Sequence, residues 1–174
     1  PVSGGGRAWR RGRWPAPVIL VDGRSGSGKS ELARRMARAL DTAGCPGVQV
    51  LHLDSWYPGW AGLSAGTRIT EELLTGRRRA WPRWDWDRNR VQESVAPTWG
   101  TPLVVEGSGS LTAVTAAVAD LRLWVDAGAE VRHRRAMDRD GEAYRPWWDM
   151  WAAQERDHVA RHRPQGLADL RILT

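Results

Sequence analysis

One short segment of the sequence has the residue types and the spacing that bind a polyphosphate. It reads Gly-Arg-Ser-Gly-Ser-Gly-Lys-Ser over residues 23–30, and it matches the pattern G-x-x-x-x-G-K-[ST] at every fixed position. Glycines let backbone N–H groups converge on phosphate oxygens without clashes from Cβ atoms. The segment follows an apolar stretch and opens an amphipathic one, which is the context of a P-loop. It predicts a site for a nucleoside triphosphate, ATP with Mg²⁺.

Each residue type in this loop has an expected role. Lys29 should reach the β- and γ-phosphates, and the hydroxyl of Ser30 should ligate Mg²⁺. Lys29 is the only lysine among 26 basic residues, the others being arginine; a compact ammonium suits this place better than a planar guanidinium. The residues expected to bind the nucleotide are Gly23, Ser25, Gly26, Ser27, Gly28, Lys29 and Ser30.

Two carboxylates follow apolar runs at points where the chain should face the phosphates. Asp54 comes after the run 48–53, and Glu106 ends the run 102–106. Asp54 is a candidate base for the hydroxyl of a phosphoryl acceptor, and Glu106 a candidate to hold or orient Mg²⁺ through water. We expect both strands to lie next to the strand of the P-loop. A helix cap or loop carboxylate is the alternative for each, and for Asp126 a cap or turn is at least as favoured.

A basic helix is predicted over residues 129–140, within a lid around 128–146 that would close over the phosphates. Arg132, Arg135 and Arg139 have the spacing i, i+3, i+7 and should share one face. Guanidinium groups stabilise the charge of a phosphoryl group in transfer, and closure excludes competing water. The alternative is a solvated face that pairs with neighbouring acidic residues.

Apolar β-branched runs alternate with helical patterns along the rest of the chain. Strands are predicted at 17–22, 48–53, 102–106, 121–125 and 168–173, and helices at 29–40, 68–74, 111–119, 129–140 and 146–162. Residues 54–101 look less regular around their single helix. Alternating strands and helices predict a parallel, five-stranded sheet in a three-layer α/β/α fold, with sites at the carboxyl ends of the strands.

The composition narrows the class of protein. The 174 residues are 41% hydrophobic and 26% charged, which suits one soluble domain, expected over residues 17–174. There is no long apolar run, so we expect no membrane contact and a cytoplasmic location. The net charge of +6 comes largely from arginines in residues 1–16, expected to be a disordered tail, so nucleic-acid binding has little support elsewhere. Cys45 is the only cysteine, which excludes an intramolecular disulfide.

Aromatic residues gather near the proposed site. The chain has 12 tryptophans and no phenylalanine. Tyr57 follows Asp54, while Trp84 and Trp86 flank Asp85. Such rings beside carboxylates could form a pocket for a planar base or a sugar face, or they could simply pack in the core.

Together these segments resemble the uridine kinase and phosphoribulokinase branch of the P-loop kinases. "VDGRSGSGKS" is similar to that family's first strand and P-loop, "LHLDSWYP" to its second strand with the catalytic Asp, "LVVEGSGSL" to the strand that ends in Glu-Gly, and "AEVRHRRAMDRD" to its lid helix. The terminal "ADLRI" fits the last strand. The resemblance spans roughly residues 18–173 and implies a kinase of a small hydroxylated molecule.

The resemblance also implies roles for residues of the acceptor side. Asp54 would be the catalytic base, Arg135 and Arg139 would neutralise the transferring group, and Arg132 would assist. Contacts with the acceptor would come from Asp54, Tyr57, Trp84, Asp85 and Arg132. The sequence departs from the family where "RWDWDRNR" has Trp86 in place of a histidine.

The sequence therefore predicts an ATP-dependent phosphotransferase acting on a small-molecule hydroxyl, with a nucleoside-like acceptor favoured. One alternative is a nucleoside monophosphate kinase, whose anionic acceptor would bind arginines such as Arg68 or Arg83. A second alternative is a P-loop protein that binds or hydrolyses nucleotide for a partner. A third, nucleic-acid binding, rests on the basic tail alone.

Overall fold

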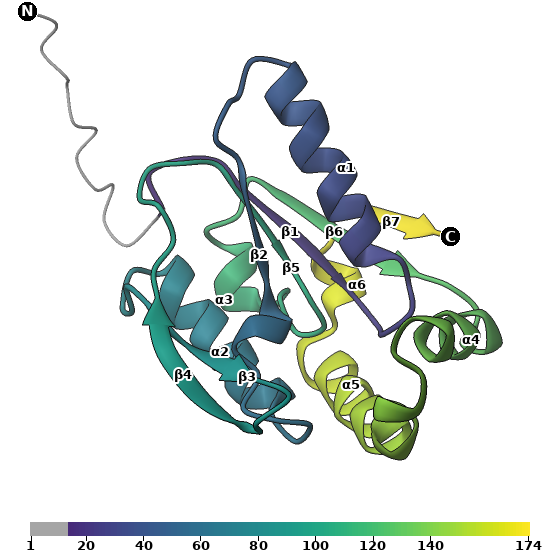
Figure 1. Cartoon of the computed structure of the whole chain (residues 1–174). Helices are drawn as coiled ribbons and strands as arrows, with labels where there is room; N and C mark the ends of the chain where they lie inside the picture. The colour runs from purple at the N-terminus through teal and green to yellow at the C-terminus, as the bar shows by residue number, and fades with distance from the viewer. Residues whose placement is uncertain (1–13) are drawn as a thin grey trace, which may run out of the picture.

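A five-stranded parallel sheet forms the centre of the protein (Figure 1). The computed structural model describes residues 14–174. The strand order is β2-β5-β1-β6-β7, so the strand that leads into the P-loop lies in the middle of the sheet. The predicted α/β class with a five-stranded parallel sheet is confirmed.

The elements follow the sequence patterns closely in most of the chain. The strands of the main sheet are β1 (Val18–Gly23), β2 (Gln49–His52), β5 (Leu103–Glu106), β6 (Leu121–Asp126) and β7 (Leu170–Leu173). The helices are α1 (Lys29–Thr42), α2 (Leu63–Leu74), α3 (Ala113–Ala116), α4 (Ala129–Asp140), α5 (Trp148–His162) and α6 (Pro164–Leu167). Short 3₁₀ turns occupy Leu53–Ser55, Gly141–Ala143 and Arg145–Trp147.

Strand β1 is buried along its whole length because both faces of the sheet are covered. Val18 and Leu20 belong to one hydrophobic cluster, and Ile19 and Val21 belong to the other. Alternate side chains of a strand point to opposite faces, so this continuous apolar run supplies two cores at once.

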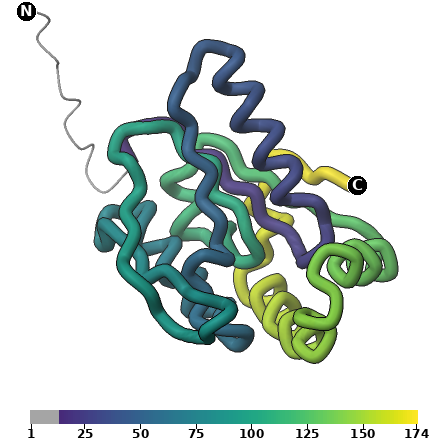
Figure 2. The backbone as a smooth tube through the Cα atoms, viewed as in Figure 1, coloured from purple at the N-terminus to yellow at the C-terminus, as the bar shows by residue number. Residues whose placement is uncertain are grey.

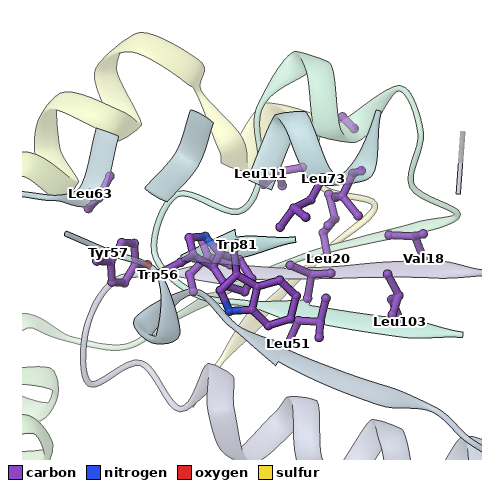
Figure 3. Close-up of a cluster of buried hydrophobic side chains, with 14 of the residues drawn as sticks. Val18, Leu20, Leu51, Trp56, Tyr57, Leu63, Leu73, Trp81, Leu103 and Leu111 are labelled. Carbon is purple, nitrogen blue, oxygen red and sulfur yellow. The ribbon is translucent and has the colours of Figure 1, made fainter. Parts of the chain in front are cut away.

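The two cores differ in what covers them. On one face, Ala33 of helix α1 packs against Ile19 and Val21, joined by the partly buried side chains of Leu32, Met36 and Leu40. The other core is larger and gathers side chains from α2, the 3₁₀ turn after β2 and the loop before α3 (Figure 3). Helices on both faces give the predicted three layers.

Strand β2 does not lie beside β1. It pairs with β5, in the register that sets His52 opposite Glu106, and β5 in turn pairs with β1. The expectation that both acidic strands neighbour the P-loop strand is therefore correct for β5 and wrong for β2. After β1 the chain runs to β2 at one edge of the sheet, and later it crosses to β6, which lies on the other side of β1. Such a change of direction opens a crevice at the carboxyl ends of the strands.

The segment expected to be irregular contains a second, small sheet. Strands β3 (Trp81–Asp85) and β4 (Arg90–Val95) form an antiparallel hairpin with a register shift between Pro82 and Trp84. The sequence did not predict this hairpin for two reasons. Pro82 lies inside a strand, where proline is unusual, and most of the neighbouring residues are polar and exposed, so there is no alternation of apolar and polar residues. Helix α2 also begins at Leu63, five residues before the predicted start.

The domain begins earlier than predicted. Trp14 is 4% exposed and belongs to the larger core, and its indole N–H donates to the carbonyl of Thr101 at 2.8 Å. The proposed tail therefore cannot extend to residue 16, and its remaining part, residues 1–13, lies outside the described residues. Within residues 14–174, no helix combines the length and the apolar character needed to cross a membrane.

A glycine in helix α2 tests the packing of the larger core. A Cβ at Gly66 would lie 2.4 Å from Cδ1 of Tyr57, a ring that is 1% exposed and has no room to move. We expect Gly66→Ala to lower the free energy of unfolding by about 1–3 kcal/mol, measured by urea denaturation. Gly166→Ala in helix α6 is the control, because nothing lies within 4 Å of its Cβ; an equal loss in both variants would contradict the packing argument.

Candidate active site

A cavity of about 410 Å³ opens beside the P-loop, where β1, β2 and β5 end. It is lined by residues of the loop, of the segment after β2, of the hairpin and of the lid. They are Ser25, Lys29, Ser30, His52, Asp54, Trp60, Trp86, Glu106, Ser108, Arg139, Asp140, Tyr144 and Trp151. Six of the predicted site residues therefore share one cavity, namely Ser25, Lys29, Ser30, Asp54, Glu106 and Arg139.

The P-loop has the backbone that its glycines were expected to provide. Gly26 and Gly28 have φ angles of 76° and 91°, a region that side chains with a Cβ rarely adopt. A Cβ at Gly26 would also lie 2.1 Å from the carbonyl oxygen of Arg132, so the loop is pressed directly against helix α4. Helix α1 begins at Lys29 with its N-terminus at the loop, as anion binding requires.

Glu106 and Ser30 meet at the floor of the cavity. The hydroxyl of Ser30 donates to Oε1 of Glu106 at 2.9 Å. Nδ1 of His52 lies 2.6 Å from the same oxygen, a contact that follows from the pairing of β2 with β5. Oε2 of Glu106 is buried without a hydrogen-bond partner, although the residue is only 2% exposed.

The carboxylate of Glu106 and the hydroxyl of Ser30 offer oxygen ligands that suit Mg²⁺. Burial alone raises the pKa of Glu106, but the hydrogen bond from His52 and the charge of Lys29 outweigh it, so the pKa lies below the ordinary 4.5. The carboxylate is thus charged at neutral pH, with one oxygen free of hydrogen bonds. Among residues 14–174, no group of three or more His, Cys, Asp or Glu could hold a metal alone, so Mg²⁺ here would share phosphate and water ligands.

Asp54 sits in the 3₁₀ turn that directly follows β2. Its side chain reaches the cavity, and the surrounding protein raises its pKa above the ordinary 3.8 by desolvation; Lys29 lowers it and Glu106 raises it further. The carbonyl oxygen of Asp54 accepts a hydrogen bond from the indole N–H of Trp86 at 2.8 Å. The hairpin therefore holds the backbone of the turn that carries the carboxylate.

The three lid arginines do not all line the cavity, although their spacing predicted a shared face. Only Arg139 lines it, paired with Asp140 at 2.6 Å. Arg132 is 3% exposed and donates to the backbone carbonyls of Ala127 and Ser25. Arg135 donates to the hydroxyl of Thr174 at 2.7 Å, and that hydroxyl donates in turn to the carbonyl of Ser27 at 3.0 Å. Arg132 and Arg135 support the loop from behind.

Besides Arg132, three residues expected at the acceptor lie outside the cavity lining. Tyr57 is 1% exposed and donates its hydroxyl to the carbonyl of Ser108 at 2.6 Å. Asp85 accepts hydrogen bonds from the backbone N–H groups of Asp87 and Arg88 and so shapes the hairpin turn. The ring of Trp84 faces Gly59. All three residues support the walls of the cavity but do not line it.

Other lining residues were not among the predicted site residues. Those with aromatic rings are Trp60, Trp86, Tyr144 and Trp151, and Trp60 stacks on Tyr144 with ring centroids 5.2 Å apart. One signal was available in the sequence: His52 lies only two residues before Asp54, at the end of the strand that leads into the turn of Asp54. The aromatic residues come from four separate segments, which no local pattern brings together.

A buried carboxylate connects the end of β1 to the neighbouring loops. Asp22 is 1% exposed and accepts hydrogen bonds from the backbone N–H groups of Gly23, Gly109 and Leu111 at 2.7, 3.0 and 2.8 Å. Nε2 of His158 lies 3.2 Å from its second oxygen. These contacts fix the P-loop strand against the loop that follows Glu106.

Several solved structures have a similar architecture. A possible uridine kinase from Bacillus stearothermophilus aligns with a TM-score of 0.60 and 18% identity, over 90% of this chain and 88% of that one. A candidate fructose transport system kinase from Silicibacter sp. TM1040 gives a TM-score of 0.55 and 18% identity, over 84% and 80%. An uncharacterised protein from Eubacterium ventriosum ATCC 27560 gives 0.50 and 11%, over 90% and 87%.

These likenesses establish the fold. The chain shares the three-layer α/β/α architecture of these structures, two of which are named as kinases, and the fold implied by the resemblance of its sequence segments is confirmed. No protein-family model and no curated protein matches the sequence. The residues of the cavity are therefore the remaining guide to the class of substrate.

The position of Asp85 leads to a test of its role. The hydrogen bond from the backbone N–H of Arg88 is the main cause that lowers the pKa of Asp85 below 3.8. The ionised carboxylate of Asp85 therefore stabilises the turn above pH 3.8, and this stabilisation is lost as the pH falls through the lowered pKa. We expect Asp85→Ala to speed hydrogen exchange across residues 81–95 at neutral pH, with Asp87→Ala as the control. A raised acceptor KM with unchanged exchange would instead restore Asp85 to the acceptor site.

Proposed function

We propose that the protein is an ATP-dependent phosphotransferase that moves the γ-phosphoryl group of ATP to a hydroxyl of a small, unphosphorylated acceptor. The observation that carries the proposal is the meeting of Lys29, Asp54 and Glu106 in the lining of one cavity beside the P-loop. An ammonium for phosphates, a carboxylate for a metal and a carboxylate for a hydroxyl are the groups this reaction needs.

The nucleotide binds through the loop. Backbone N–H groups around Gly26 and Gly28 and the N-terminus of helix α1 attract the β- and γ-phosphates. Lys29, which lines the cavity, contacts the same phosphates. Arg132 and Arg135 act indirectly, since Arg132 donates to the carbonyl of Ser25 and Arg135 donates to the hydroxyl of Thr174.

Ser30 and Glu106 would hold the Mg²⁺ that accompanies ATP. When bound, the ion neutralises charge on the phosphates and helps to align them for in-line transfer. Glu106 offers the oxygen that lacks a hydrogen-bond partner, and His52 keeps the carboxylate in its orientation through the contact with Oε1.

Asp54 accepts the proton of the acceptor hydroxyl as that oxygen attacks the phosphorus. A carboxylate whose pKa is raised above 3.8 is a stronger base than an ordinary one. Arg139 lines the same cavity and would stabilise the charge on the transferring group. Its ion pair with Asp140 holds the guanidinium in place.

The walls of the cavity favour an acceptor with an apolar face and no phosphate. Trp60, Trp86, Trp151 and Tyr144 contribute aromatic surface that suits a nucleoside-like base or a sugar ring. A nucleoside monophosphate would require further cations. Arg68 and Arg83, the two candidates for that task, are absent from the lining, and Arg83 is paired with Glu93 at 3.1 Å.

Asp54→Asn tests the proposal directly. ATP consumption is measured with Mg²⁺ over nucleosides, nucleotides, sugars and other small alcohols, for the wild type, for Asp54→Asn and for the exposed control Asp41→Asn. We expect one alcohol to accelerate ATP use and Asp54→Asn to reduce kcat by at least about 10²-fold, while ATP affinity and the Asp41→Asn enzyme stay unchanged. Because the pKa of Asp54 is raised, activity should fall on the acid side with a midpoint above 3.8. ATP binding with no accelerating acceptor would favour the alternative of a nucleotide-binding protein that serves a partner.

Trp86 is expected to act on both the base and the acceptor. Trp86→Phe keeps an aromatic wall but removes the donor to the carbonyl of Asp54, so kcat should fall by a few-fold to about tenfold, in line with the loss of one hydrogen bond, with little change in the acceptor KM. Trp86→Leu also removes the aromatic face, and the acceptor KM should rise. Steady-state kinetics with the ATP KM as internal control decide this; equal kcat and KM in all three proteins would exclude Trp86 from the site.

A further inference from the structure

A second buried carboxylate reaches the P-loop from behind. Glu155 of helix α5 is 2% exposed and is not among the residues that line the cavity. Its Oε1 accepts a hydrogen bond from the backbone N–H of Ser25 at 2.6 Å and another from the indole N–H of Trp151 at 3.1 Å. Its Oε2 lies 3.4 Å from Nε of Arg24. Helix α5 thus holds the first turn of the loop through a charged group.

Ser108 joins the same network. Its hydroxyl oxygen lies 2.9 Å from Oε1 of Glu155 and 2.9 Å from the carbonyl oxygen of Gly23. A hydroxyl has a single proton to donate, and a carboxylate is the stronger acceptor. Glu155 therefore connects helix α5, the loop that follows β5 and the P-loop through one oxygen atom.

The charge of Glu155 is costly at this place. A buried carboxylate loses its hydration, and it repels the polyphosphate that the loop attracts. A neutral side chain with an oxygen would satisfy the N–H of Ser25 without that repulsion. What the charge adds is strength, because hydrogen bonds to an ionised acceptor are shorter and about twice as strong as neutral ones.

The residue that Glu155 holds is also in contact with the lid. Ser25 lines the cavity together with Tyr144 of the lid, and its carbonyl oxygen accepts a hydrogen bond from Arg132 of helix α4. Tyr144 lies between helices α4 and α5 in the chain, and both helices lie close to the loop between β1 and α1 (Figure 2). Ser25 is the point where the lid segment and helix α5 both meet the P-loop.

We propose that Glu155 is a positioning residue that holds the Ser25–Gly26 part of the P-loop in its phosphate-binding shape and couples it to the lid through helix α5. The proposal rests on the nucleotide site proposed above, but it does not depend on the identity of the acceptor. Removal of the acceptor oxygen frees the N–H of Ser25, and the loop loses the conformation that converges on phosphate.

Two substitutions at Glu155 and one control separate this role from charge and from general stability. Glu155→Leu removes the hydrogen-bond acceptor, whereas Glu155→Gln keeps an acceptor oxygen and removes the charge. Asp157→Asn removes a charge from an exposed position of the same helix. For each protein, Mg·ATP affinity is measured by calorimetry, hydrogen exchange of residues 23–30 by mass spectrometry without nucleotide, and global stability by thermal unfolding.

We expect Glu155→Leu to weaken Mg·ATP binding by about tenfold or more, as loss of a partner for a buried N–H predicts, and to speed exchange in residues 23–30. Glu155→Gln should weaken binding by roughly threefold, because a neutral acceptor forms a weaker hydrogen bond. Asp157→Asn should match the wild type in both measurements. A role confined to global stability would lower the melting temperature but leave the affinity of the folded protein unchanged.

The sign of the effect in Glu155→Gln decides the proposal. If this variant binds Mg·ATP as tightly as the wild type or more tightly, with unchanged exchange in residues 23–30, the carboxylate only repels phosphate and the proposal is overturned. If Glu155→Leu does not fold, the Mg·ATP affinity and the loop exchange of Glu155→Gln alone decide the outcome. If the wild type itself binds no Mg·ATP, the proposed function fails, while the exchange of the nucleotide-free loop still tests the positioning role.

Discussion

The structure depends on keeping a polar backbone loop in an open, anion-binding shape at the end of a fully buried strand. The loop carries positive φ angles at Gly26 and Gly28, a backbone conformation that allows N–H groups to converge on an anion. Such a conformation persists only where its surroundings determine it. Here they include the carbonyl of Arg132 against Gly26, the hydroxyl of Thr174 against the carbonyl of Ser27, and Glu155 on the N–H of Ser25.

This requirement explains why so many charged residues of the second half are buried or paired behind the loop. Arg132 and Glu155 are 3% and 2% exposed, and both end on the backbone of Ser25. Charges of opposite sign on two different helices hold one residue, so the loop is fixed relative to α4 and α5 together. Arg139, further along α4, is then the lid arginine whose side chain lines the cavity.

The sequence predicts the sheet and the loop well because both rest on local patterns. The apolar run at 18–21 is buried on both faces of the sheet, and the spacing of Gly26, Gly28 and Lys29 matches the P-loop pattern at each of these positions. The sequence does worse where function depends on contacts between distant segments. The spacing of Arg132, Arg135 and Arg139 indicates a shared face, but the loop packed against that face separates their roles. Asp85 and Tyr57 have the residue types of an acceptor site, yet hydrogen bonds to the hairpin turn and to Ser108 occupy them.

The hairpin carries part of the proposed acceptor side on a unit that is separate from the main sheet. Its two strands pair with each other in a separate two-stranded sheet, so its sequence can change without disturbing the main sheet. It nevertheless reaches the site at one point, where Trp86 donates to the carbonyl of Asp54 and contributes to the cavity lining. Trp86 also packs near Trp60, with ring centroids 4.7 Å apart, and Trp60 stacks on Tyr144 of the lid. The hairpin is therefore joined to the lid through Trp60. A substitution at this position is therefore expected to change both the shape of the proposed acceptor pocket and the support of Asp54, the proposed base. Lys29, Ser30 and Glu106 keep their places on the main sheet and the P-loop.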